Sequence, residues 1–333
     1  MFSFLFNTLE LVSRSVHRLN YGEIPLLIAR WEKNPVASYL LRSSFLKKEP
    51  LFKLFDKDFF YSHLLPDKIS YRSDKTKFVD KAKLSAQLEV LIKEINQKKE
   101  TFSHFSIIRD SNFNKKREAG LIILKFKDYP FVVKLFMETP KSFVRPYAKG
   151  FEPRFFFIMG SVNRHLMGFT RIKNVENIRN KIATSKQWSK KIETPRKWHW
   201  VPKNAQNIKL IGKNIGNTKQ IETTIPGTYA IIADAIELKD KCFSIFNRKA
   251  RKMCMKLCNY LDVAIDPHID NFLQEKHTNK IVIVDTEHFP TLVGFKGKLK
   301  FKGYFSWYIR LSKKCVGDLF FRHKRKRHKK RIT

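Results

Sequence analysis

The spacing of apolar residues changes near residue 101, and this change limits what the chain can fold into. Before it, residues 80–99 carry Ala, Leu and Ile at helical spacing, with Lys and Glu on the other face. Asp80 is well placed to cap that predicted helix. After the change come three short β-rich runs separated by turn-forming residues, 104–108, 121–126 and 131–136. The pattern predicts an α+β protein in which three consecutive antiparallel strands follow a helix.

The remaining segments extend this organisation in both directions. Proline punctuation across residues 1–101 favours several short helices, which we interpret as a helical N-terminal extension. Residues 153–183 are predicted to be helical, residues 207–211 and 228–233 to be strands, and residues 239–261 to form a long amphipathic helix. The segment 212–217 between the last two strands reads as a hairpin turn, because it lacks the pattern of a phosphate-binding loop. The Trp198-His199-Trp200 cluster is expected to pack in the core.

The charge of the chain is extreme. The 333 residues carry a formal net charge of +37, and the segment 322–331 contributes eight Lys and Arg with no acid. Such a field attracts polyanions, which include nucleotide phosphates, nucleic acids and anionic membranes. Biased codon usage is an equally weighted explanation of the composition. The apolar share of 43%, with 30 Phe, is enough for a sizeable core.

The cysteines and the apolar runs indicate the compartment. Four cysteines are too few for a disulfide framework, and Cys254 and Cys258, four apart on the last predicted helix, are expected to be buried thiols. No apolar run approaches the ~18 residues that span a bilayer. We therefore expect a soluble cytoplasmic protein without a transmembrane segment. The basic tail is open to three functional readings, as a nuclear address, a nucleic-acid arm or a membrane anchor.

The segment after residue 261 has the most informative order of polar residues. Asp266 is followed five residues later by Asn271, at the start of an apolar strand. A turn and a second apolar strand then lead to Asp285, in Asp-Thr-Glu. Two hairpin strands joined by a turn bring these three side chains to one end of the hairpin. One carboxylate can then orient a hydroxyl, while the amide and the other carboxylate hold a divalent cation.

This order resembles the protein-kinase-like superfamily, in which H-R-D-x-x-x-x-N precedes D-F-G. The resemblance implies a two-lobed fold with an antiparallel five-stranded N-lobe over 102–236 and a short helical C-lobe over 237–318. The segment 1–101 would precede the lobes, and 319–333 would be a basic tail. It implies ATP and Mg²⁺ as cofactors and transfer of a phosphoryl group to a hydroxyl acceptor, which the sequence does not identify.

By the same resemblance, Asp266 matches the catalytic base and Asn271 and Asp285 match the Mg²⁺ ligands. Lys134, in Phe-Val-Val-Lys, resembles the V-A-I-K lysine that contacts the α- and β-phosphates. The end of the fifth strand would meet adenine through backbone groups near Ala233 to Ala235.

The carboxylate that pairs with Lys134 is less well defined. Glu152, ahead of the predicted helix, is assigned to that role, and Glu138 and Glu176 stay as alternatives. Arg171 in that helix is expected to form a salt bridge to Glu152 or Glu176.

The sequence also departs from the kinase pattern. Ala264 stands where H-R-D has its His, and Asp285-Thr286-Glu287 replaces D-F-G, in the style of aminoglycoside-phosphotransferase-like and lipopolysaccharide-kinase-like members. Between the first two strands only Gly120 is present, so a Gly-rich lid is missing, and Lys115, Lys116 and Arg117 lie there instead. These departures keep a second hypothesis open: a pseudokinase, or a non-catalytic kinase-like scaffold that binds nucleic acid or an anionic membrane through its basic surface.

Overall fold

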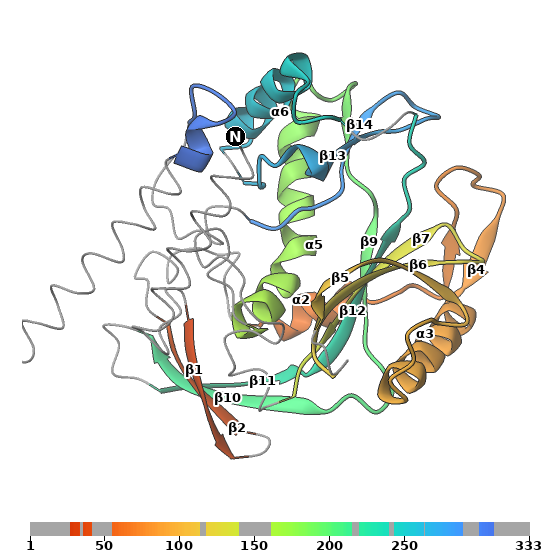
Figure 1. The fold of residues 1–333 in the computed structure, drawn as a ribbon, viewed down its shortest axis with the longest axis vertical. Helices are drawn as coiled ribbons and strands as arrows, with labels where there is room; N and C mark the ends of the chain where they lie inside the picture. Colours follow the sequence, from red (N-terminus) through yellow and green to blue (C-terminus); the bar gives the residue numbers. More distant parts are fainter. Residues whose placement is uncertain are drawn as a thin grey trace, which may run out of the picture.

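The computed structural model places helices and strands of an α+β protein along most of the chain (Figure 1). The residues that it describes are 27–33, 36–41, 55–113, 118–139, 161–214, 220–239, 243–262, 264–288 and 300–309. Glu152, the cationic residues 115–117 and the basic tail therefore lie outside the described residues. Within the described ranges, none of the helices combines the length and the apolar character that crossing a bilayer requires.

The main sheet has five antiparallel strands in the order β5-β6-β7-β12-β9. They are β5 (Phe105–Phe113), β6 (Gly120–Phe126), β7 (Phe131–Met137), β12 (Thr228–Asp234) and β9 (Lys197–Trp200). The three consecutive strands and the strand near 228–233 are confirmed. The expectation that the segment 207–211 belongs beside them is wrong, because the Trp-His-Trp segment of β9 fills that edge.

Helices cover both faces of this sheet, because side chains along a strand point alternately to its two sides. On one face, β-strand residues such as Val133 and Ile232 pack with buried leucines of α3 (Lys81–Asn96). On the other, Phe136 and Ile231 pack with α5 (Ser161–Ala183) and α6 (Arg248–Tyr260). Figure 1 shows α3 and α5 on opposite sides of the sheet. A sheet buried on both faces explains the continuous apolar runs of its strands.

A second sheet corrects the expectation of an all-helical N-terminal extension. Its order is β1-β2-β10-β11, from β1 (Leu27–Lys33), β2 (Val36–Leu41), β10 (Asn207–Asn214) and β11 (Gln220–Pro226). The β10–β11 pair is the expected hairpin, but its second strand is the segment 220–226. β2 runs parallel to β10, from a distant part of the chain. Because strand formation depends on such partners more than on local preference, residues 27–41 read wrongly as helix.

Several short elements complete the fold. The pair β3 (Lys68–Ser70) and β4 (Phe78–Asp80) follows α2 (Lys57–Ser62). A three-stranded sheet joins β13 (Phe272–Gln274), β14 (Ile281–Ile283) and β8 (Ile192–Glu193), with β14 between the other two. The 3-10 helix η2 (Ile269–Asn271) leads directly into β13. This hairpin carries the Asp266–Asp285 segment against α5.

Helix ends agree with the sequence in part. Asp80 is the N-cap residue of α3, but its side chain makes no capping hydrogen bond. α6 begins at Arg248, later than the predicted residue 239, and Asn247 caps it by accepting from the N–H of Ala250 at 3.0 Å. Cys254 and Cys258 lie on α6 as buried free thiols, as expected.

Candidate active site

A lysine and an aspartate far apart in the sequence meet at the centre of the candidate site. Lys134 stands in the middle of β7, where it pairs with Ile123 of β6 and Ile231 of β12. Its Nζ lies 3.0 Å from Oδ2 of Asp285, the residue two positions beyond the end of β14. Both side chains are largely shielded from solvent, with relative exposures of 17% and 27%. The strand register places the lysine on the same face of the sheet as Phe136, toward α5.

Helix α5 supplies an arginine that the sequence reading did not assign to this site. Arg171 contacts Oδ1 of Asp285 with one guanidinium nitrogen, and its Nη2 lies 2.9 Å from Oε1 of Glu287. The arginine side chain is 4% exposed. The expected salt bridge from Arg171 to Glu176 is therefore wrong, and the one to Glu152 lies outside the described residues. Arg171 instead joins the crossing helix to the Asp-Thr-Glu segment.

The charges around Asp285 determine its protonation. Burial by itself raises the pKa of this carboxyl group, but the positive charges of Arg171 and Lys134, with a smaller contribution from Lys197, hold the pKa well below its usual value. Burial, followed by the charge of Arg171, lowers the pKa of the Lys134 ammonium group, while Asp285 raises it. The carboxylate of Asp285 is thus ionised across the physiological range, which is the form that a cation or an ammonium group needs.

Hydrogen bonds within the loop from Asp266 to Asn271 fix its shape. Oδ1 of Asp266 accepts from the N–H of His268 at 3.0 Å, and Nδ2 of Asn271 donates to the carbonyl oxygen of Asp266 at 3.1 Å. The hydroxyl of Tyr304 accepts from the N–H of Ile269 at 2.9 Å. The N–H of Val284 donates to the carbonyl oxygen of Asn271 at 3.0 Å, which holds the loop beside the residue that precedes Asp285. Asp266, Asn271 and Asp285 are therefore brought together, as the sequence predicted.

The pKa of the Asp266 carboxyl group is raised toward neutral pH. Burial raises its pKa to about 7, and the negative charges of Asp285 and Glu287 add to this effect against the hydrogen bond from His268. A carboxyl group that exchanges its proton near pH 7 is suited to general acid–base work.

Two further side chains tie the parts of the site together, and neither was predicted. Nδ2 of Asn174, on α5, donates to the carbonyl oxygens of Ala264 at 2.8 Å and Thr286 at 2.9 Å. Nζ of Lys197, at the start of β9, donates to Oγ1 of Thr286 at 2.8 Å and to the carbonyl oxygen of Val284 at 3.1 Å. Burial, followed by the charge of Lys134, lowers the pKa of Lys197. The sequence offered one signal for Lys197: a lysine directly precedes the aromatic segment Trp198-His199-Trp200, which was expected to be buried.

No described glutamate of α5 pairs with Lys134. Oε1 of Glu176 lies 2.9 Å from Nε2 of His63, so this alternative is wrong. Glu138 follows β7 directly, and its N–H donates to the carbonyl oxygen of Gly227 at 2.7 Å. Glu152, the first choice, lies outside the described residues. The carboxylate that the structure sets against Lys134 is Asp285.

The backbone at the end of β12 is largely engaged. Ala233 lies between Val132 of β7 and Lys197 of β9, in the interior of the sheet. The N–H of Ala235 donates to the carbonyl oxygen of Pro130 at 2.9 Å. An adenine contact through this N–H would require that bond to break, so the assignment of Ala233 and Ala235 to nucleotide binding stays a prediction.

The oxygen donors present fit Mg²⁺. Mg²⁺ prefers hard oxygen ligands and is often held by one or two protein side chains, with waters and phosphates completing its shell. Asn271 uses Nδ2 toward Asp266, which leaves its Oδ1 as the acceptor atom, and Asp285 is ionised. Groups of three or more His, Cys, Asp or Glu arranged around a metal position are absent from the described ranges. The oxygen atoms of Asn271 and Asp285 are therefore of the kind that Mg²⁺ prefers.

Fold and site together define an α+β protein in which an antiparallel sheet, a crossing helix and a β-hairpin surround a buried cluster of Lys134, Arg171, Lys197, Asp285 and Glu287. A scan against models of known protein families finds no match, and a search of curated proteins finds no significant relative.

Proposed function

We propose that this chain is an ATP-dependent phosphotransferase of the protein-kinase-like kind, acting on a hydroxyl acceptor. The observation that carries the proposal is the contact of 3.0 Å between Lys134 and Asp285, beside the loop that holds Asp266 and Asn271. Lys134 comes from β7, whereas Asp266, Asn271 and Asp285 come from one later segment around the hairpin of β13 and β14. Chance occurrence of the D-x-x-x-x-N pattern gives no reason for a lysine 151 residues away to meet the second aspartate.

Each of these residues has a distinct role in the proposed reaction. Lys134 would bind phosphate oxygens of the nucleotide, and Asp266 would orient the acceptor hydroxyl and take its proton. Asn271 and Asp285 would hold Mg²⁺, which when bound neutralises the charge of the triphosphate. The hydrogen bonds that His268 and Asn271 donate and that the Tyr304 hydroxyl accepts keep the loop in one shape, so less reorganisation is needed when substrates bind.

Arg171 allows Asp285 to change partners without leaving a buried charge unpaired. The arginine contacts both Asp285 and Glu287. If Asp285 turns to a cation, Arg171 keeps Glu287 as its counter-charge. The cluster is therefore compatible with a loaded and an unloaded state.

The test is Mg-ATP binding and turnover by the full chain and by Asp285→Asn. We expect Mg-ATP, but not Mg²⁺ alone, to raise the melting temperature of the unchanged protein, and slow ATP hydrolysis or self-labelling to be measurable. Asp285→Asn should lose both effects, because the amide cannot replace the ionised ligand. Asp262→Asn is the matched control, since Asp262 pairs with Lys181 away from the cluster. Turnover that is unchanged in Asp285→Asn would refute the proposal.

The rate should depend on pH through Asp266. Its carboxyl group has a pKa of about 7, and the active form is the ionised one. We therefore expect kcat/KM for ATP turnover to fall about tenfold per pH unit below that pKa and to level off above it. A pH profile at constant ionic strength measures this, with Asp266→Asn as the comparison. An acid limb that persists in the residual activity of Asp266→Asn would assign the titration to another group.

A non-catalytic kinase-like scaffold is the second candidate, and specific contacts favour it. Both oxygens of Asp285 are contacted by cationic side chains, and the N–H of Ala235 is already bonded. The charge of +37 would then serve binding to a polyanion such as nucleic acid or an anionic membrane. This candidate predicts polyanion binding that weakens steeply with salt and no stabilisation by Mg-ATP.

A further inference from the structure

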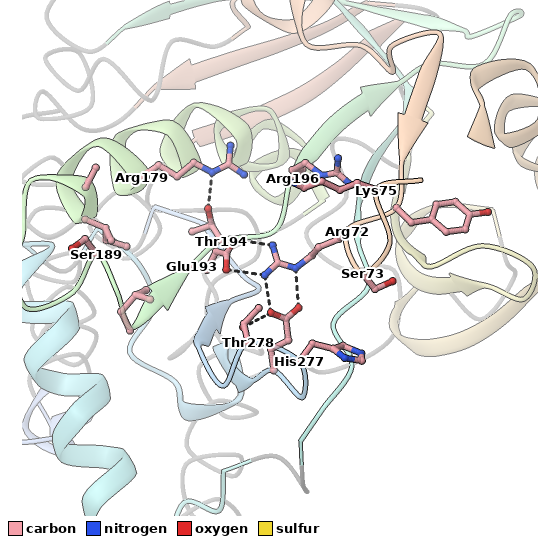
Figure 2. A pocket seen from close by; sticks show the side chains of 15 residues that line it. Arg72, Ser73, Lys75, Arg179, Ser189, Glu193, Thr194, Arg196, His277 and Thr278 are labelled. Atoms are coloured by element: carbon pink, nitrogen blue, oxygen red, sulfur yellow. Dashed lines mark hydrogen bonds and ion pairs between the residues drawn. The ribbon is translucent and has the colours of Figure 1, made fainter. Parts of the chain in front are cut away.

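A second site has a lining that shares no residue with the Lys134–Asp285 contact. It is a pocket of about 740 Å³, bounded by the turn between β3 and β4, the C-terminal part of α5, the segment 189–196 and the turn between β13 and β14. Figure 2 shows its lining side chains. None of Lys134, Asp266, Asn271 and Asp285 lines it. Two residues that are adjacent in sequence belong to different sites: Arg196 lines the pocket, whereas Lys197 donates a hydrogen bond to Thr286 beside Asp285.

The carboxylates in this pocket are already neutralised by one arginine. Nε and Nη2 of Arg72 each lie 2.8 Å from an oxygen of Glu275, which is a two-pronged ion pair. Nη1 of the same guanidinium donates to Oε1 of Glu193 at 3.1 Å. Nζ of Lys280 lies a further 3.5 Å from Glu193. These acids therefore have little negative charge left for the other cations of the pocket.

Arg179 is a cation without a direct ion pair, although the charges of Glu176, Asp234 and Glu193 act on it and raise its pKa against the effect of burial. Its Nε donates to Oγ1 of Thr194 at 2.7 Å and its Nη2 to the carbonyl oxygen of Pro195 at 2.8 Å, and both acceptors are neutral. Among the described residues it forms no ion pair. The side chain is half-buried, and burial lowers its pKa. A partly desolvated guanidinium whose hydrogen bonds go to neutral acceptors would be stabilised by a direct anionic partner.

Two more cations stand close to Arg179 in the pocket. Arg196 reaches Asp234 with its Nη2 at 2.7 Å, and Lys75, in the exposed turn before β4, contributes an ammonium group at the rim. Figure 2 shows Arg179, Arg196 and Lys75 along one side of the pocket, above the Arg72 pairs. Arg72 and Arg196 are already paired with carboxylates, so among the described residues the lining cations without a direct ion pair are Arg179 and Lys75. A phosphate monoester, which carries two negative charges above its second pKa of about 6, suits such a pair of cations.

The rest of the lining suits an organic group. Ile182, Ile192 and Ala183 form an apolar wall, and Tyr71 and the hydroxyl groups of Ser73 and Ser189 are polar neighbours. The volume lies within the range of roughly 300–1,000 Å³ that is usual for small-molecule sites. A phosphate ion alone would leave most of this space to water.

We propose that this pocket binds a small organic phosphate, with the phosphoryl group against Arg179 and Lys75 and the organic body against Ile182 and Ile192. The inference is independent of the proposed phosphotransfer. The anion would supply the direct ion pair that Arg179 lacks, and the apolar wall would discriminate between organic phosphates and inorganic phosphate.

Calorimetric titration of the full chain tests the proposal with glucose 6-phosphate and AMP as probes, and with inorganic phosphate, glucose and adenosine for comparison. We expect at least one phosphate ester to bind, its unphosphorylated form not to bind, and inorganic phosphate to bind more weakly. Arg179→Gln should weaken binding roughly tenfold or more, because a charge-assisted contact is lost. Arg179→Lys should recover part of it.

Three further variants control for misfolding and for binding at the Lys134–Asp285 site. Lys75→Gln removes an exposed cation that no described contact needs, and we expect a weakening of roughly threefold. Lys77→Gln makes the same change two residues away, outside the pocket, and should have no effect. Binding must survive in Asp285→Asn. The proposal is overturned if no ester binds, if inorganic phosphate binds as tightly as both esters, or if Arg179→Gln and Lys75→Gln bind like the unchanged protein.

Discussion

Replacing Arg171 with methionine is expected to lower the free energy of unfolding by about 3–5 kcal/mol at neutral pH. The arginine is 4% exposed and contacts two carboxylates, Asp285 and Glu287. Methionine fills similar space but leaves Glu287 without its ion pair to the guanidinium, and Asp285 with Lys134 alone. Removing one partner of a buried ion pair is costly, because the remaining charge stays in a poorly solvated position. Urea unfolding followed by circular dichroism measures the loss.

The pH dependence of this loss identifies its cause. The pKa of Asp285 is held well below its usual value in the folded protein, so its stabilising contribution is present above the pKa of the unfolded chain. That contribution disappears as the pH falls through the folded pKa. The difference between the unchanged protein and Arg171→Met should therefore be largest near neutrality and shrink in acid. A difference that is independent of pH would indicate lost packing instead of lost charge.

Lys173→Met is the matched control on the same helix. Lys173 is 31% exposed, and its Nζ lies 3.4 Å from Oδ2 of Asp56. Pairs at such positions contribute up to about 1 kcal/mol, since solvent screens them. If Arg171→Met costs no more than Lys173→Met, the buried charge cluster does not stabilise the fold.

Gly168→Ala is expected to lower the free energy of unfolding by about 3 kcal/mol or more. A Cβ at this position of α5 would overlap the hydroxyl oxygen of Tyr229 and lie 2.9 Å from Cζ of Phe136. Tyr229 cannot move easily, because it is fully buried, stacks on Phe136 with ring centres 4.7 Å apart, and donates its hydroxyl to the carbonyl oxygen of His165 at 2.5 Å. Thermal melting measures the effect.

A second substitution separates the effect of this clash from the general effect of replacing glycine with alanine in a helix. Tyr229→Phe removes the hydroxyl oxygen that the new methyl group would meet, so Gly168→Ala should cost less in that background. The rescue should be partial, because Phe136 stays close and the carbonyl oxygen of His165 loses its partner. Gly303→Ala is the control, since nothing lies within 4 Å of a Cβ there. Equal costs in the two Tyr229 backgrounds would rule out the close approach of α5 to β12.

The sequence predicted the parts of the fold that depend on local pattern. The three strands before residue 138 were predicted from short β-rich runs between turns, and the crossing helix and α6 from helical pattern, and the structure confirms the presence of all five elements. The convergence of Asp266, Asn271 and Asp285 also follows locally, because a hairpin brings its two ends together. Lys134 could be assigned only through the resemblance, and its meeting with Asp285 agrees with that expectation.

Long-range pairing was decided by the tertiary structure alone. Residues 27–33 and 36–41 form strands, of which β2 pairs with the distant strand β10. The Trp-His-Trp segment forms β9 by pairing with the edge of β12 that β7 leaves free. A strand's partners contribute more to its formation than its own residues do, so local pattern cannot assign it.

The chain by itself determined which polar residues could form a site, through their order and their positions on strands and hairpin. The tertiary structure decided which charges balance them. Arg171, and not a glutamate, faces the site from α5, and Lys197 enters from β9. Ion pairs depend on the distance between side chains and on the exclusion of water from between them. Neither quantity is encoded in any short stretch of sequence, so both follow only from how the sheet, the helix and the hairpin pack.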